Sequence, residues 1–243
     1  MRSAGFSRGG SGAGFSLLEV VIAVGILSLI MLGVALALKG TGDVVAVGAT
    51  QNEMERTSQN ALDRMALELR DSAARVITVA ANGSAIQFQV PVDLDGNGTV
   101  LDRNGAVEFG FLAGAAPSKG TITYRFVQNL IQGRPEVLDE RVAGLKLNDD
   151  ADRCDRFARG CVVRVTQAAG GAEVTGPALT GRWLVQPEGD WGGDINGDGA
   201  ADPIFKLDAA SGRVLIGLWS MQVDGRSSAL VVHRSTSVCL RNR

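Results

Sequence analysis

Oxygen-bearing side chains alternate with glycines in one loop, a pattern that suits a divalent cation. Asp93, the first of them, takes position 1, and Gly98 takes position 6, where a sharp turn is needed. Ca²⁺ binds six to eight oxygens, but position 12 holds Asn104 instead of a bidentate Glu. A calcium loop and a polar turn held by side-chain hydrogen bonds therefore both stay open. The candidate ligands are Asp93, Asp95, Asn97, Thr99 and Asp102.

A second acidic loop has closer calcium spacing. Its oxygens occupy positions 1, 3, 5 and 9, its position 7 offers a backbone carbonyl, and Gly199 is at position 6. Phe205 at position 12 separates it from an EF-hand, so it resembles the short calcium loops of secreted repeat proteins. We expect a structural Ca²⁺ here, with a polar turn as the alternative, because no base or nucleophile accompanies the acids. The candidate ligands are Asp194, Asn196, Asp198, Ala200 and Asp202.

The three cysteines allow one disulfide. Cys154 and Cys161 flank a short polar segment, 155–160, and we expect them to close a small loop. Cys161–Cys239 is the rival pair, since connectivity cannot be deduced from sequence. Zinc is not expected, because only His233 could complete a ligand set and no spacing matches a zinc finger.

An uninterrupted apolar segment near the N-terminus must position everything that follows. No charged residue occurs from Val20 to Leu38, and a helix over 15–38 would span about 35 Å, enough to cross a bilayer. The segment is too long for the core of a signal peptide, so we expect a retained anchor behind a short leader. Arg2 and Arg8 favour a cytoplasmic leader. Glu19, just inside the segment, is costly in a membrane and therefore a functional candidate.

The residues from Gly14 to Glu19 resemble the processing site of type IV prepilins and type II secretion pseudopilins. That family has a basic leader ending in Gly, then a Phe, then Glu at the fifth mature position, and Gly14, Phe15 and Glu19 match. The resemblance implies that a prepilin peptidase cuts after Gly14 and N-methylates Phe15. In a filament, the Glu19 carboxylate would then neutralise the new amine of a neighbouring subunit.

The rest of the chain predicts an α+β fold. Leu62, Met65, Leu69, Ala73 and Val76 recur every three or four residues and form one helical stripe, which we expect to pack on the protein's own sheet and to end near Arg75. From residue 84 onward the apolar period is two, as in an antiparallel sheet, the expected strands being 86–90, 107–109, 122–126, 145–147, 163–165, 214–223 and 229–240. The pilin resemblance implies the same architecture: a leader (1–14), a long helix (15–80, transmembrane over 15–38) and a β-rich globular domain (81–243). The two glycines within 39–43 predict a bend or a locally melted turn in the helix.

The composition argues against most other functions. The net charge is −2, which gives no basic surface for nucleic acid, and no nucleotide-binding, hydrolase or metalloprotease motif occurs, so we do not expect an enzyme. The chain resembles PilW-type minor pilins and the related J-type pseudopilins in its length, in the segment 61–70 and in the tail 234–242. The resemblance implies a minor pilin that primes pilus assembly from the inner membrane, with its domain in the periplasm and the assembled pilus at the cell surface. Its partners would be other minor and major pilins, or pseudopilins, and the assembly platform.

Three alternatives stay open. The first is a minor pseudopilin of a type II secretion system, which differs only in the machine it serves. The second is a tip adhesin whose calcium loops order a binding surface. The third is a membrane-anchored hydrolase, although neither His233 nor Ser227 and Ser228 has an evident catalytic partner in the sequence.

Overall fold

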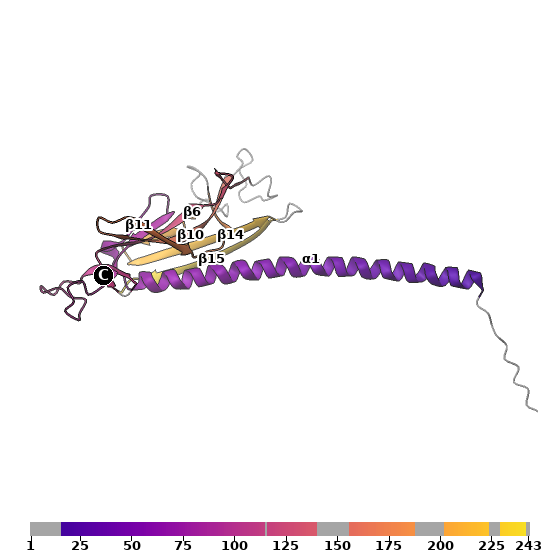
Figure 1. Cartoon of the computed structure of the whole chain (residues 1–243), viewed down its shortest axis with the longest axis horizontal. Helices are drawn as coiled ribbons and strands as arrows, with labels where there is room; N and C mark the ends of the chain where they lie inside the picture. The colour runs from indigo at the N-terminus through magenta and orange to yellow at the C-terminus, as the bar shows by residue number, and fades with distance from the viewer. Residues whose placement is uncertain (1–15, 115, 140–155, 188–201, 224–228, 242–243) are drawn as a thin grey trace, which may run out of the picture. The chain divides into compact units, whose positions relative to one another are not determined.

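A computed structural model describes residues 16–114, 116–139, 156–187, 202–223 and 229–241 (Figure 1). The chain divides into two compact units, residues up to Thr50 and Gln51–Arg243. Helix α1, Leu17–Arg70, begins in the first unit and ends in the second. A short 3₁₀ helix, Ala74–Val76, follows it, and the remaining elements are strands.

Helix α1 continues through the glycines at its middle, so the turn is not melted there. Residues 39–43 are helical, and the Thr41 hydroxyl donates to the Ala37 carbonyl at 2.9 Å, as a side chain inside a regular helix does. A glycine costs a helix about 1 kcal/mol relative to alanine. Two of them do not break a helix that already extends for more than twenty residues on each side, because propagation of a helix is far easier than its nucleation.

The second unit is built on strands. They are β1 (Thr78–Val79), β2 (Ala85–Phe88), β3 (Val90–Pro91), β4 (Phe109–Ala113), β5 (Ala116–Ser118), β6 (Gly120–Gln128), β7 (Leu130–Ile131), β8 (Arg134–Pro135), β9 (Val137–Asp139), β10 (Arg156–Ala168), β11 (Glu173–Ala178), β12 (Leu184–Pro187), β13 (Phe205–Asp208), β14 (Arg213–Val223) and β15 (Ala229–Cys239). All pairings are antiparallel, so the α+β class predicted from the sequence is confirmed.

The main sheet is curled. Its path runs β1-β2-β6-β10-β12-β14-β13, with β15 beside β14, and β9 and β11 beside β10. The two ends of this path meet, because the Phe205 amide of β13 donates to the Gly83 carbonyl in the β1–β2 turn at 2.9 Å. Gly83 has a φ of +64°, and a Cβ there would lie 2.2 Å from the Cβ of Pro203, so this position requires glycine.

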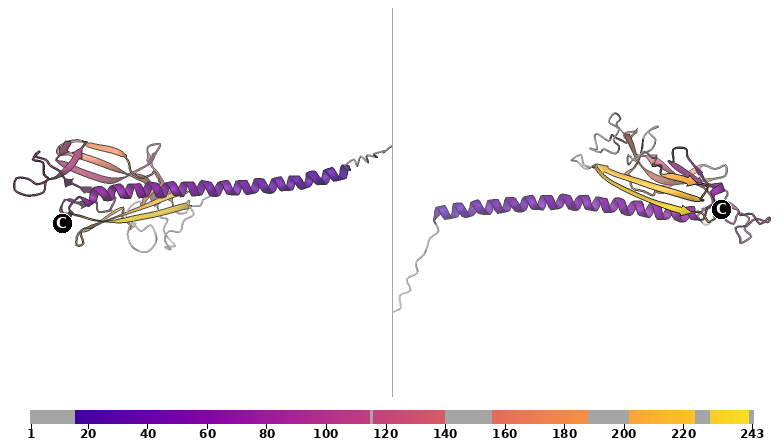
Figure 2. Two further views of the ribbon diagram at one scale, coloured as in Figure 1. Left: turned by 90° about the horizontal axis from the view of Figure 1, so that it is seen from below. Right: turned by 180° about the vertical axis from the view of Figure 1, so that it is seen from behind.

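The last five turns of α1 pack on the sheet through one buried stripe. Leu62, Met65 and Leu69 join residues of β2, β6, β10 and β14 in one core, which confirms that the helical stripe covers the protein's own sheet. The stripe also extends toward the N-terminus to Met54 and Ser58, beyond the predicted residues. Figures 1 and 2 show this part of α1 lying along β15, where Arg234 pairs with Glu55 at 2.8 Å.

The helix ends at Arg70, earlier than predicted, because other groups take over its backbone bonds. The Arg241 amide donates to the Arg70 carbonyl at 3.0 Å, which satisfies one of the free carbonyls at the helix end. The Ser72 hydroxyl, fully buried, donates to the Gln89 carbonyl at 2.7 Å and turns the chain toward β2 and β3. Ala73 is buried as predicted, while Val76 is half-buried in the 3₁₀ helix.

Most predicted strands match observed ones, with one difference. The strand predicted at 107–109 begins only at Phe109, because the preceding residues belong to the loop after β3. β14 is a central strand, because it pairs with β12, β13 and β15. Val214, Ile216 and Leu218 are buried on one face; on the other, Met221 is buried and Leu215 is 43% exposed. The strand predicted at 145–147 lies outside the described residues.

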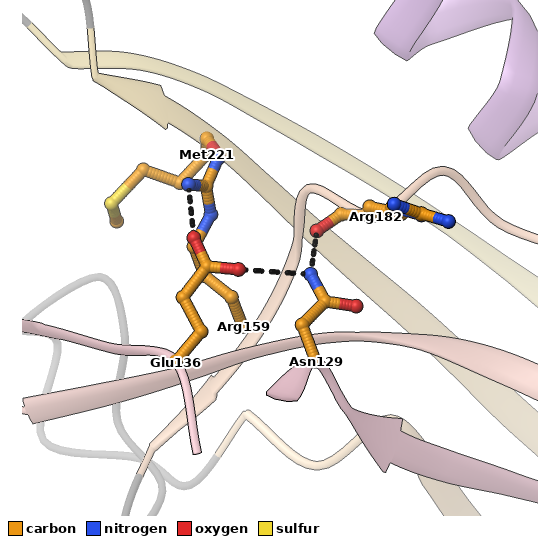
Figure 3. Close-up of polar contacts among 5 residues, drawn as sticks. All are labelled: Asn129, Glu136, Arg159, Arg182 and Met221. Atoms are coloured by element: carbon orange, nitrogen blue, oxygen red, sulfur yellow. Dashed lines mark hydrogen bonds and ion pairs between the residues drawn. The ribbon is translucent and has the colours of Figure 1, made fainter. Parts of the chain in front are cut away.

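A polar network anchors the segment that joins β6 to β9 (Figure 3). Arg159 of β10 donates to Glu136 at 2.6 Å and to the Met221 carbonyl at 3.3 Å. The Asn129 amide donates to the other Glu136 oxygen at 3.1 Å and to the Arg182 carbonyl at 3.0 Å. The Arg159–Glu136 pair is less than one-fifth exposed. It therefore fixes the β7–β8 hairpin against the sheet instead of acting as a solvated surface pair.

Candidate functional site

The first part of α1 presents apolar side chains on every side. Its best 18-residue window has a mean hydropathy of 2.8, and none of that window is buried. By length and composition, this helix is able to cross a bilayer. The Ser28 hydroxyl donates to the Val24 carbonyl at 2.8 Å, so this polar group needs no water. Exposed residues here include Leu17, Val21, Ile26, Leu29, Ile30, Met31, Leu36 and Leu38.

Glu19 lies in the first turn of α1, where its charge suits the helix. The amides of Glu19 and Val20 both donate to the Ser16 carbonyl, at 2.9 and 3.2 Å. A carboxylate in the first turn interacts favourably with the partial positive charge of the free backbone amides. Gly14 and Phe15 lie outside the described residues, so their processing stays a prediction.

The Asp93 carboxylate organises the first acidic loop by accepting backbone hydrogen bonds. The amides of Gly96, Asn97 and Gly98 donate to it at 2.8, 3.1 and 2.8 Å. Desolvation raises the pKa of Asp93, but these amides together outweigh it, and the pKa lies below its ordinary value. These are the contacts of a polar turn, the alternative that the sequence left open.

Three carboxylates nonetheless meet at this loop. Asp93, Asp95 and Glu108 each place an oxygen within 4.8 Å of the others. Sequence reasoning missed Glu108 because it lies outside the loop. Two backbone hydrogen bonds bring it close: the Leu94 amide donates to the Glu108 carboxylate at 2.6 Å, and the Val92 amide donates to the Glu108 carbonyl at 3.1 Å. Three oxygens are half or fewer of the six to eight that Ca²⁺ binds.

The other predicted ligands of this loop make hydrogen bonds elsewhere in the turn. The Asn97 side-chain oxygen accepts hydrogen bonds from the amide and hydroxyl of Thr99, at 2.8 and 2.7 Å. Asp102 holds a separate turn by accepting from the amides of Asn104 and Ala106, both at 2.8 Å, and these amides lower its pKa. The structure therefore joins Asp93 and Asp95 with Glu108, and it does not join them with Asp102.

The second acidic loop is mostly outside the described residues. Asp194, Asn196, Asp198 and Ala200 belong to that segment, so calcium binding there stays a prediction. Asp202 is described and half-buried just before β13, and its charge acts on His233.

The cysteines remain unpaired among the described residues. Cys161 and Cys239 carry free thiols, and burial raises the pKa of Cys161. Cys154 lies outside the described residues, so its pairing with Cys161 stays a prediction. One condition on that pair follows from β10, which is extended over the five steps from Arg156 to Cys161, about 16 Å. Disulfide-bonded Cα atoms lie about 4.4–6.8 Å apart, so the bond requires the start of β10 to give up its extended form.

His233 has a packing role in the structure. It faces Trp219 across the β14–β15 pair, and the two rings stack with centroids 4.1 Å apart. Desolvation lowers the pKa of His233, and the nearby Asp202 raises it by less. The stack is the contact that a packed histidine makes.

The comparisons leave the family open. No family model, no curated protein and no solved structure matches the chain.

Proposed function

We propose that this protein is a minor pilin, incorporated in few copies into a type IV pilus, whose assembly it helps to prime. The observation that carries the proposal is the combination of the prepilin-like residues Gly14, Phe15 and Glu19 with the helix that they open. That helix is apolar and exposed over its first part and continues without interruption into the helix that covers the sheet. A cleavable leader in front of an exposed apolar helix suits a subunit that later leaves the bilayer for another apolar environment.

In this proposal the mechanism is helix packing. Cleavage after Gly14 creates an amine at Phe15, one helical turn from Glu19. A protonated amine and a carboxylate from adjacent subunits neutralise each other, which removes much of the cost of holding either charge among apolar helices. The cross-subunit pair also sets the axial register, because only one stagger brings the two groups together. The sheet domain then presents its loops to other minor pilins.

Mass spectrometry of the N-terminus tests the proposal. In the native host, protein from the membrane fraction should begin at N-methylated Phe15. Gly14→Val should leave the leader attached, because a bulky residue at the cleavage site blocks the peptidase. Gly10→Val, the same change within the leader, is the matched control and should be processed normally. An intact Met1 in the wild-type protein, or normal cleavage of Gly14→Val, would refute the proposal.

A Glu19 variant separates processing from assembly. Glu19→Gln removes the charge with little change in volume, so the protein should still be cleaved and methylated but should be depleted from sheared filaments. Normal incorporation of Glu19→Gln would mean that the carboxylate does not set the register. If the wild-type protein copurifies with a secretion pseudopilus instead of a pilus, the helix mechanism stands and the machine it serves is the type II secretion system.

A further inference from the structure

A pocket of about 190 Å³ opens between the last turns of α1 and the sheet. We call it the Arg64–Arg164 pocket. One wall carries two guanidinium groups, Arg64 from α1 and Arg164 from β10. The other walls come from β10, β11 and the residue after it: Thr166, Val174, Gly176, Pro177 and Leu179.

The charges of this pocket are not balanced. Arg164 donates through Nε to Glu68 at 2.9 Å, and both side chains are about one-quarter exposed. Within the described part of the chain, Arg64 has no hydrogen-bond or ion-pair partner. Two cations and one acid therefore meet at this pocket; Arg164 and Glu68 are partly buried, and Arg64, which carries the excess positive charge, is exposed.

A buried hydroxyl group borders the same charges. Tyr124 of β6 lies directly opposite Arg164 in the β6–β10 register and is fully buried. Its hydroxyl has no hydrogen-bond partner with normal geometry. Burial, and then the charge of Glu68, raise the pKa of Tyr124, so the hydroxyl stays a neutral donor at all physiological pH values. The Tyr124 hydroxyl thus lies beside Glu68, the same acid that holds Arg164.

The pocket lies next to an open sheet edge. Among the described residues, β11 pairs with β10 alone, and five of its six residues are exposed. Val174 on this strand is 65% exposed and also lines the pocket. An unpaired strand edge offers backbone groups with which an extended peptide can pair.

We propose that the Arg64–Arg164 pocket binds the carboxylate of a Glu or Asp side chain in an extended segment of a partner protein, which lies along β11. The two guanidinium groups select an anion and hold it by charge-assisted hydrogen bonds. Val174, Pro177 and Leu179 cover the aliphatic stem that a free inorganic anion lacks. The inference rests on the pocket alone and does not depend on leader processing.

The test uses the full-length protein in detergent and two pools of immobilised hexapeptides. Both pools have blocked ends and vary Val, Thr, Ser and Ile around the centre, and the central residue is Glu in one pool and Gln in the other. The wild-type protein should be retained about tenfold more by the Glu pool, the size expected for one charge-assisted contact. In Arg64→Gln this preference should fall at least threefold, and Arg64→Lys should restore part of it.

The matched control is Arg56→Gln, the same change at an exposed position of α1 that does not line the pocket. It should keep the full preference for Glu. Equal retention by the two pools, or an equal loss in Arg56→Gln and Arg64→Gln, would overturn the proposal. Competition by inorganic phosphate at an affinity above that of the Glu pool would overturn the peptide as occupant.

Discussion

The two parts of helix α1 differ in their distribution of polar residues and in their surroundings. Leu27 in the first part is 55% exposed, whereas Leu62 in the second is 2% exposed, although both are helical leucines. The second part alternates buried and charged positions, and the first part is apolar all round. Apolar content thus shows how much surface must leave water, and the distribution of polar residues shows whether the chain's own sheet can cover it.

The largest effect should come from truncating the covered part. Leu62→Ala removes buried methyl groups and leaves a cavity, so the free energy of unfolding of the sheet domain should fall by about 2–5 kcal/mol. Leu27→Ala, the same change in the exposed part, should leave it unchanged. Urea unfolding of the detergent-solubilised chain, followed by tryptophan fluorescence, measures both. Equal effects of the two substitutions would mean that the two parts are covered alike.

A charged residue should be tolerated in the second part of α1 but not in the first. Leu27→Lys places an ammonium near the middle of the apolar segment, which costs about 2.5–3.5 kcal/mol for membrane insertion. The protein should therefore shift from the membrane fraction to the soluble or degraded fraction. Leu67→Lys is the control, because Leu67 is 60% exposed in the second unit and a lysine there stays in water. Loss of membrane association in Leu67→Lys would contradict the comparison.

Substitutions at the glycines between the two parts of α1 should have a smaller effect, on local helix stability. Gly40→Ala and Gly42→Ala each improve local helix propensity by about 1 kcal/mol, and both residues lie inside the continuous helix. Hydrogen exchange of amides near residues 39–46 should slow in both variants. Gly48→Ala has open space around its added Cβ and should slow exchange around its own position instead. Unchanged exchange near 39–46 would mean that the glycines do not limit helix stability.

The smallest effect concerns the acidic loop. The folded-state pKa of Asp93 is lowered, so its contribution to stability is present above the ordinary carboxyl pKa of about 3.9 and is lost as pH falls through the lower folded value. In EDTA at pH 7, Asp93→Asn should lower the Tm more than Asp95→Asn. Both variants lose one charge, but the Asp95 carboxylate accepts a backbone hydrogen bond from Asn97, whereas Asp93 accepts three. The Tm difference between wild type and Asp93→Asn should shrink below about pH 4. If added Ca²⁺ raises the wild-type Tm and neither variant responds, the loop is also a cation site.

Sequence patterns predicted the helix, its stripe and the longer strands, such as β6, β14 and β15, because these follow from periodicity. They missed Ser58, which is buried because its hydroxyl meets that of Ser220 at 3.3 Å, a contact that no local pattern encodes. They missed Glu108 for the same reason, since its approach to Asp93 depends on how the chain folds back. They missed Arg64 and Arg164 because each looks like an ordinary surface arginine until the helix is placed on the sheet.

The end of α1 carries a consequence for protein synthesis. Arg70 receives the amide of Arg241, and the buried stripe packs on β14, which begins at Arg213. At about 5–20 residues per second, the ribosome needs roughly 10–35 s to proceed from Arg70 to Arg241. During this time only the earlier strands, such as β2 and β6, are available to cover the stripe, so the nascent chain should depend on a holding chaperone. Removing the last few residues would remove the Arg241 amide from the end of α1. A C-terminal tag should therefore disturb folding less than a C-terminal truncation.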